Sequence, residues 1–547
     1  MINRLLNSQT KTVGAAAGIL AVSTLISRIL GVGRDWLLAK MFGAGPDVDV
    51  YFAAFRIPDM IYGILIAGGI VVAFLPLFAE YFSKNKEEAW RFTNNTINIF
   101  FFLLIVFCLV LFIFTPLLVK LITPGFSPEQ LQKTIFLTKL MFLSPLFLGL
   151  SSIFSGILQY FNRFLAYSLA PIFYNLGIIL GLVFLAPKLG IAGVALGVIL
   201  GAFLHLVIQI PSAINCGLKH QPIFDFKDQR LKRIFLLMIP RTLGVIGWQI
   251  NLFIITAIAS GLAVGSISIF NFANNLQGLA SGIIGVSFSM AVFPSLSRAW
   301  VNGAKEEFLE RFSSVFRQIV YMIVPLSVLI FVLRNQIVEI VLKHGEFSQF
   351  SAHLTAASLG LFSFSIFAFS LIPLLVRAFF SFQDTKTPTL IVFLMVFLNI
   401  ILSLYLTSVL ATENSFHAFF EKIFHLQGIE DIRIVALPLA YSSSIIFQFV
   451  LLLVSLRRRI SGINLKAIFN SSLKIVLAGI LMTVVMYSVI NFMPTDLKLQ
   501  TFFSLILETL LVAISGIAVY FLATFLLKSP EAKLIFKRTN RQSNGKN

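Results

Sequence analysis

The chain contains apolar runs that are too long and too continuous for a water-soluble core. Residues 101–119, for example, read FFLLIVFCLVLFIFTPLLV without one charged side chain. A helix needs about 20 apolar residues to cross a hydrocarbon layer of roughly 30 Å, whereas a membrane β-strand shows alternation over about ten residues. We count about fourteen such runs, separated by short polar breaks, each long enough to span a bilayer as a helix. The sequence therefore predicts an all-α polytopic membrane protein.

Composition and charge support the same class. Of 547 residues, 58% are hydrophobic and only 12% are charged, far from the averages of soluble domains. Lysine and arginine gather in alternate loops, notably residues 218–233, residues 457–466 and the tail after Leu527. By the positive-inside rule this asymmetry predicts a multi-pass membrane protein with both termini in the cytoplasm. The net charge of +19 is then explained by anionic lipid head groups, without any nucleic acid.

The sequence does not indicate an enzyme, a metal site or a cofactor. Cys108 and Cys216 fall in or beside apolar runs, and the histidines show no metal-ligand spacing. The longest external connection, at about residues 411–433, is short for a catalytic aqueous domain. We therefore expect no catalytic residues and no bound metal.

The first two apolar runs carry ionisable residues that a bilayer disfavours. These residues are Arg28, Arg34, Asp35, Asp49, Arg56 and Asp59. Each charge near the bilayer centre costs about 2.5 to 3.5 kcal/mol on insertion scales, so such residues normally face water or a partner. Helical residues seven apart share a face, which places Arg28 above Asp35, Ser27 above Arg34 and Asp49 above Arg56. Each of the two spans should therefore carry one polar stripe.

Two interpretations of this cluster remain open. Guanidinium groups bind phosphate oxygens in a bidentate manner, so Arg28, Arg34 and Arg56 suit a multivalent anion such as a diphosphate. Alternatively, the charges form internal ion pairs that only fix helix packing, or the arginines extend to the membrane interface. Asp35 and Asp49 can equally be solvated residues near the external end.

An internal repeat predicts two lobes. The segment VVAFLPLFAEYF at residues 71–82 recurs as SMAVFPSLSRAW at residues 289–300, with Pro76 and Pro294 in register. We predict six-helix lobes at residues 1–218 and 219–460, two further helices at 461–530, and a basic cytoplasmic tail at 531–547. Repeated lobes commonly place a transported substrate between them.

Several strings resemble the MurJ (MviN) family, which comprises lipid II flippases of the MOP exporter superfamily. They are SRILGVGRDWLLAKMFGAGPDVDVYFAAFRIP at residues 27–58, TPGF at 123–126, APIFYNLGIILG at 170–181, QINLFIITAIASGLAVGSIS at 249–268 and RAFFSFQDTKTP at 377–388. The resemblance covers nearly the whole chain, and the first and last strings are quite specific.

This resemblance implies a function and roles for particular residues. The chain would move an undecaprenyl-diphosphate-linked peptidoglycan precursor from the inner to the outer leaflet by alternating access. Arg28 and Arg34 match family arginines that handle the diphosphate, and Arg56 and Asp49 match a basic and an acidic cavity residue. Asp384 and Lys386 match a charged turn between helices ten and eleven. Helices thirteen and fourteen would form a groove for the lipid tail.

The chain departs from the family pattern at three positions. Tyr62 stands where the second helix usually has another arginine, Asn275 replaces the arginine of the eighth helix, and Gly278 replaces an acidic residue. The arginines missing at Tyr62 and Asn275 would each be worth about 1.5 to 3 kcal/mol to a phosphate. Two alternatives follow, namely a flippase for another polyprenyl-diphosphate-linked oligosaccharide, or a non-transporting membrane scaffold with the same fold.

Energy coupling and partners complete the expectations. No carboxylate lies deep in a span of the second lobe, so the sequence does not identify a coupling ion. The membrane potential can act on Arg28 and Arg34, at about 2.3 kcal/mol per charge per 100 mV. The expected partners are the lipid-linked diphosphate substrate, membrane lipids and other proteins of cell-wall synthesis.

Overall fold

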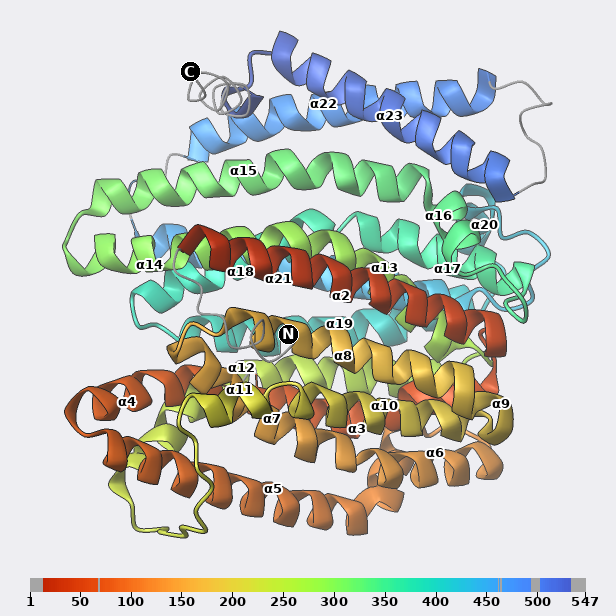
Figure 1. Cartoon of the computed structure of the whole chain (residues 1–547). Coiled ribbons are helices and arrows are strands. Elements are labelled where there is room, and N and C mark those ends of the chain that lie inside the picture. Colours follow the sequence, from red (N-terminus) through yellow and green to blue (C-terminus); the bar gives the residue numbers. More distant parts are fainter. Residues whose placement is uncertain (1–12, 67–68, 461, 463–464, 493–501, 533–547) are drawn as a thin grey trace. The chain divides into compact units, whose positions relative to one another are not determined.

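A computed structural model describes residues 13–66, 69–460, 462, 465–492 and 502–532. Its regular elements are helices throughout the described residues (Figure 1). Packing divides the chain into two compact units, Met1–Ser268 and Ile269–Asn547. The predicted all-α fold is confirmed.

The first unit consists of long helices joined by short connections. Its helices are α2 (Val13–Phe42), α3 (Pro46–Ile66), α4 (Ile70–Lys84), α5 (Lys86–Ile122), α6 (Pro128–Met141), α7 (Leu143–Tyr160), α8 (Phe164–Leu180), α9 (Ala186–Leu189), α10 (Ile191–Val207), α11 (Ile210–Asn215) and α12 (Gln229–Ser260). A π-helical turn, η1 (Gly181–Leu185), joins α8 to α9. Helix α3 packs against α6, α7 and α12, while α2 packs against α8. These contacts bring the two charged helices onto one scaffold.

Glycine governs the closest helix contact of this unit. A methyl group on Gly177 of α8 or Gly181 of η1 would collide with the backbone of Gly201 or Gly197 of α10. In a bilayer such small residues let helix backbones approach and gain dispersion energy that the hydrophobic effect does not supply there. Helices α8 and α10 therefore pack closely together, and α2 packs against α8.

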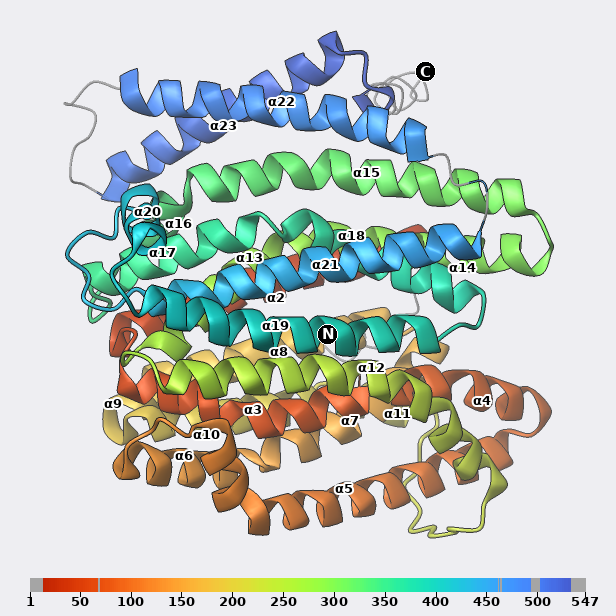
Figure 2. The same ribbon diagram turned by 180° about the vertical axis from the view of Figure 1, so that it is seen from behind.

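The second unit also consists of helices joined by connections. Its helices are α13 (Ser266–Ser281, which begins in the first unit), α14 (Ser287–Val301), α15 (Lys305–Val332), α16 (Arg334–Val341), α17 (Gln349–Ser363), α18 (Ile366–Ser381), α19 (Lys386–Leu410), α20 (Ser415–Phe424), α21 (Ala436–Arg459), α22 (Leu465–Phe492) and α23 (Phe502–Leu526). The π-helical turn η2 (Gly282–Val286) precedes α14, and the 3₁₀ turn η3 (Arg433–Val435) precedes α21. Helices α22 and α23 pack together, and α22 also contacts α15 (Figure 2).

The predicted count of fourteen spans is not confirmed. In the described residues, 11 helical segments are long and apolar enough to cross a membrane, or 12 if the α17–α18 pair, bent by 46°, counts as one span. Helices α2 and α3 are not among them. Helix α3 carries Asp47, Asp49, Arg56 and Asp59 within its 21 residues.

The predicted lobes differ from the two units in one respect. The structure divides after Ser268, because α12 packs against α3, α4 and α5 and so belongs with the first unit. The boundary at residue 218, drawn from the sequence repeat, stays a prediction. Residues 1–12 and 533–547, which include most of the predicted basic tail, lie outside the described residues.

Candidate substrate site

The polar stripe of α2 is held by one residue of α8. Arg34 Nη2 lies 2.7 Å from Asp35 Oδ1, and Arg34 Nε donates to the same oxygen at 3.0 Å. Arg34 Nη1 also approaches Asn175 Oδ1 at 3.5 Å. Asn175 Nδ2 donates to Ser27 Oγ at 3.1 Å. The helical spacing correctly predicted that Ser27 and Arg34 share a face.

Asn175 is a site residue that sequence reasoning missed. Its amide has both donors and an acceptor, so one side chain can join a hydroxyl and a guanidinium. The signal was a lone asparagine in the apolar string APIFYNLGIILG. A polar residue inside a membrane span deserves a named partner, and here the partners lie on α2.

The polar stripe of α3 has a different use. Asp49 is buried and accepts hydrogen bonds from Gly265 N at 2.7 Å, Ser268 N at 2.8 Å and Ser268 Oγ at 2.6 Å. Arg56 is also buried, and its Nε donates to Thr256 Oγ1 of α12 at 2.9 Å. Both side chains therefore tie α3 to α12 and to the segment that follows it.

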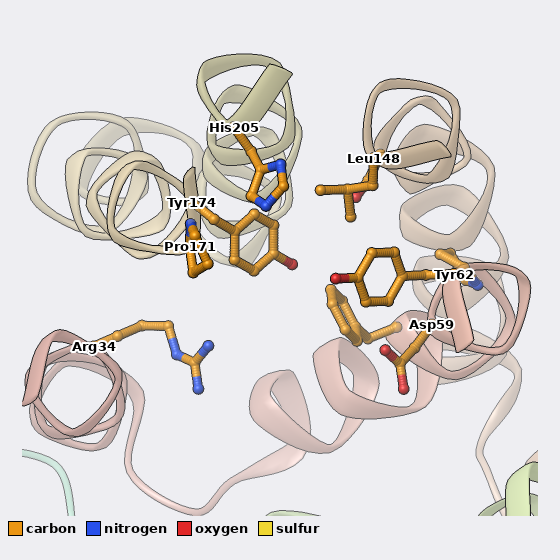
Figure 3. A pocket seen from close by; sticks show the side chains of 10 residues that line it. Arg34, Asp59, Tyr62, Leu148, Pro171, Tyr174 and His205 are labelled. Carbon is orange, nitrogen blue, oxygen red and sulfur yellow. The ribbon is translucent and has the colours of Figure 1, made fainter. Parts of the chain in front are cut away.

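A cavity of about 200 Å³ lies between five helices of the first unit. Polar side chains from all five helices line it, and most of them are labelled in Figure 3. The lining residues are Arg34 of α2; Phe55, Pro58, Asp59 and Tyr62 of α3; Ser144 and Leu148 of α7; Pro171 and Tyr174 of α8; and His205 of α10. The cavity joins a guanidinium, a carboxylate, two phenols and an imidazole within one low-dielectric space.

His205 is the second residue that the sequence did not reveal. Its Nδ1 lies 2.7 Å from Ser151 Oγ of α7, and Gln209 Nε2 donates to the same hydroxyl. The ring meets that of Tyr174 edge to face, with centroids 6.5 Å apart. These contacts fix the imidazole at the cavity wall. A single histidine in an apolar run gives no spacing from which this could have been read.

Tyr62 lines the cavity together with Arg34 and Asp59. In Figure 3 its hydroxyl points into the cavity. Its side chain offers the cavity one hydroxyl, a neutral donor that can also accept. Among the described residues that line this cavity, Arg34 is the only arginine or lysine.

Arg28 lies on α2 with a partly exposed side chain. It does not line the cavity. The structure therefore brings Arg34, Asp59 and Tyr62 together at one cavity, while Arg28, Asp49 and Arg56 lie elsewhere on the same two helices.

The remaining predicted residues belong to the second unit. Asn275 and Gly278 lie on α13, where a methyl group on Gly278 would meet nothing within 4 Å. Asp384 accepts hydrogen bonds from Thr387 N at 3.0 Å and Thr387 Oγ1 at 2.8 Å at the start of α19. Lys386 is the exposed first residue of that helix. Asp384 and Lys386 thus form a helix-capping turn.

Burial acts to raise the pKa of Asp384, but the hydrogen bonds from Thr387 and the charge of Arg459 outweigh it and lower the pKa overall. Within the described residues, no group of three or more His, Cys, Asp or Glu side chains is arranged to hold a metal ion.

Comparison with solved structures defines the class of the fold. An inward-facing multidrug resistance MATE family transporter of the MOP superfamily superposes with a TM-score of 0.62 at 13% identity, covering 82% of this chain and 100% of that chain. At this identity the likeness concerns the fold alone. The chain has the fold of a MOP-superfamily transporter.

Closer similarities specify the family. The model of the family "Lipid II flippase MurJ" matches residues 38–508. A probable lipid II flippase MurJ of Buchnera aphidicola subsp. Schizaphis graminum is 34% identical over 372 residues, covering 67% of this chain and 72% of the relative. That of Vibrio cholerae is 29% identical over 386 residues, covering 68% and 73%. The chain belongs to the MurJ family of lipid II flippases, so the family resemblance is confirmed.

A solved structure agrees. The structure of a lipid II flippase MurJ in an inward closed conformation matches with a TM-score of 0.73 at 25% identity, covering 93% of this chain and 98% of that chain. The family consists of transporters rather than enzymes. Together with the apolar helices, this makes the chain a multi-pass membrane protein. The cytoplasmic placement of both termini stays a prediction.

Proposed function

We propose that this chain translocates lipid II, the undecaprenyl-diphosphate-linked peptidoglycan precursor, from the inner to the outer leaflet of the bacterial cell membrane by alternating access. Membership of the MurJ family carries this proposal. The polar cavity on α2 and α3 supports it, because ionisable groups within membrane spans normally face a polar ligand, water or a partner group of the protein.

Arg34 is the principal contact for the diphosphate in this proposal. Its side chain is 24% exposed, and its guanidinium faces a cavity that also offers the hydroxyls of Tyr62 and Tyr174. A guanidinium binds two phosphate oxygens at once and stays charged at physiological pH. Asp35 orients this guanidinium through the 2.7 Å ion pair. Arg28, partly exposed on the same helix, supplies a further cation.

Arg56 and Asp49 have a supporting role in this proposal. Each is buried and hydrogen-bonded to groups of α12 or the segment after it. They keep α3 in the position that presents Asp59 and Tyr62 to the cavity. We further propose that the membrane potential drives transport through the charges of Arg28 and Arg34, and that other proteins of cell-wall synthesis receive the product.

A depletion experiment tests the function. The chain is expressed in cells depleted of their own lipid II flippase, and precursor exposure at the outer leaflet is measured. Restored exposure is expected. Correct membrane insertion without restored exposure would refute lipid II transport and favour a different lipid-linked oligosaccharide or a scaffold, the two readings that Tyr62 and Asn275 suggest. Assaying the extruded lipid-linked glycans of the same cells separates these two.

A further inference from the structure

The connection between α11 and α12 is an ordered loop held along the first turns of α5. Three asparagines of α5 bind its backbone. Asn94 Nδ2 donates to Lys219 O at 2.9 Å, and Asn94 Oδ1 accepts from Gln221 N at 3.0 Å. The other two continue the pattern further along the loop.

Asn95 Nδ2 donates to Asp225 O at 2.9 Å and its Oδ1 accepts from Asp225 N at 2.7 Å. Asn98 Nδ2 donates to Gln221 O at 2.7 Å and Ile223 O at 3.1 Å. Backbone polar groups need hydrogen-bond partners. The side-chain amides of α5 supply these partners to the loop backbone. The loop has a fixed position on α5.

This position is the level at which α5 becomes apolar. From Ile99 to Val119 the helix has no charged residue. Phe226 of the loop packs edge to face on Phe102, with ring centroids 6.3 Å apart. Phe224 and Phe226 are nevertheless 55% and 60% exposed. Exposed phenylalanine rings at such a boundary favour contact with lipid, because apolar surface is disfavoured in water.

An apolar slot opens beside this aromatic pair. It has a volume of about 310 Å³ and is lined by Ile99, Leu103, Phe226, Leu231, Lys232, Phe235 and Leu236. Lys232 is its single charged lining residue. An apolar slot with one ammonium group at its wall suits an acyl chain that ends in a negatively charged head group.

The surrounding charge is also positive. Lys219, Lys227 and Lys232 are exposed, whereas Asp225, Asp228 and Glu80 each bind another group of the protein. Asp228 accepts from Arg230 Nε at 2.7 Å and from Asn95 at 3.4 Å, and Asp225 Oδ1 accepts from Lys227 N. Burial acts to raise the pKa of Asp228, but its bonds from Arg230 and Asn95 lower it overall. Glu80 contacts Lys84 and Arg233.

We propose that this surface, formed by the loop at residues 217–228, the start of α12 and the face of α5 from Ile99 to Leu103, is a binding site for an anionic phospholipid of the adjoining leaflet. One acyl chain occupies the slot, and the head-group phosphate contacts Lys232 and Lys227. The bound lipid holds the first unit at a set depth in the membrane. The site lies outside the proposed substrate cavity and does not depend on which lipid-linked precursor is moved.

Native mass spectrometry of the full chain tests this proposal. The protein is mixed with equal amounts of phosphatidylglycerol and phosphatidylcholine, and the ratio of retained adducts is measured. The wild type should retain phosphatidylglycerol preferentially. Lys232→Gln should lower the ratio about fivefold, since one basic residue near an anionic surface is worth about 1 kcal/mol. Leu103→Trp, which fills the slot without altering charge, should lower phosphatidylglycerol retention as well.

Lys188→Gln is the matched control, because Lys188 is an exposed lysine on α9 of the same unit, far along the sequence from the slot. It should leave the ratio unchanged. Equal effects of Lys232→Gln and Lys188→Gln, an unaltered result for Leu103→Trp, or no lipid preference in the wild type would each overturn the proposal. Flippase activity in the depletion experiment is a separate readout.

Discussion

Helices α2 and α3 carry the same kinds of residue at the same helical spacing, yet the structure uses them differently. On α2, Arg34 reaches a cavity with its side chain 24% exposed and one carboxylate beside it. On α3, Arg56 is 9% exposed and Asp49 is 3% exposed, and both are bonded to neighbouring segments. One stripe is available to a ligand, and the other holds the scaffold. The groups that pack against an embedded charge therefore decide its role.

The largest expected effect comes from Arg34. Arg34→Ala should reduce lipid II exposure at the outer leaflet by about a hundredfold or more, since two charge-assisted hydrogen bonds of about 1.5 to 3 kcal/mol each are lost. Its thermal stability should change little. Arg91→Ala, at an exposed arginine of α5, is the control and should transport normally. Normal transport by Arg34→Ala would remove α2 from the substrate site.

Asp49 should behave in the opposite way. Asp49→Ala leaves three donors without their acceptor, and unpaired buried donors cost about 1 to 3 kcal/mol each. The purified protein should therefore melt at a clearly lower temperature and be recovered in smaller amounts. Asp49→Asn, which keeps one acceptor oxygen, should lie between. A stable Asp49→Ala protein that fails only in transport would move Asp49 to the substrate site.

Arg56 provides the direct counterpart to Arg34. Arg56→Met keeps most of the buried volume but removes the bond to Thr256, so we expect a loss of about 1.5 to 3 kcal/mol in stability. Thr256→Val should reproduce a part of that loss. Transport per folded molecule should fall less than in Arg34→Ala. A stability equal to that of the wild type would place Arg56 among the ligand contacts.

At Tyr62 the test adds a cation to the cavity instead of removing one. Tyr62→Arg adds a cation to the cavity that Asp59 and Arg34 also line. Binding of a water-soluble prenyl diphosphate, followed by calorimetry, should strengthen about tenfold, a gain of roughly 1.4 kcal/mol. Tyr62→Phe should change it little. Weaker binding by Tyr62→Arg would show that Asp59 neutralises any added cation.

Asp384 should give the smallest effect. Like Asp49, it accepts hydrogen bonds from a backbone and a side-chain donor, but it is partly exposed at the start of α19. Its pKa is lowered in the folded protein, so its stabilising contribution is present above the ordinary pKa of an aspartate and is lost as the pH falls through the folded pKa. Melting temperature between pH 6 and 3 should decline slightly less in Asp384→Asn than in the wild type. Parallel curves would contradict this account.

The sequence predicted the class of fold for a simple physical reason. A bilayer offers no hydrogen bonds, so long charge-free runs must form helices, as they do in the described residues. The count was harder, since the charges embedded in α3 lower its apolar content. Spacing along one helix also placed Ser27 with Arg34, because a helical face is a local property.

Which side chains meet across helices was decided only by the tertiary structure. The sequence alone determined a membrane transporter fold, a family and a set of costly charges in its first two spans. It did not reveal that Asn175 joins α8 to α2, that His205 lines the cavity, or that Asp49 serves the backbone at Gly265. These contacts join residues far apart in the chain, and their geometry depends on how helices pack, which local periodicity does not encode.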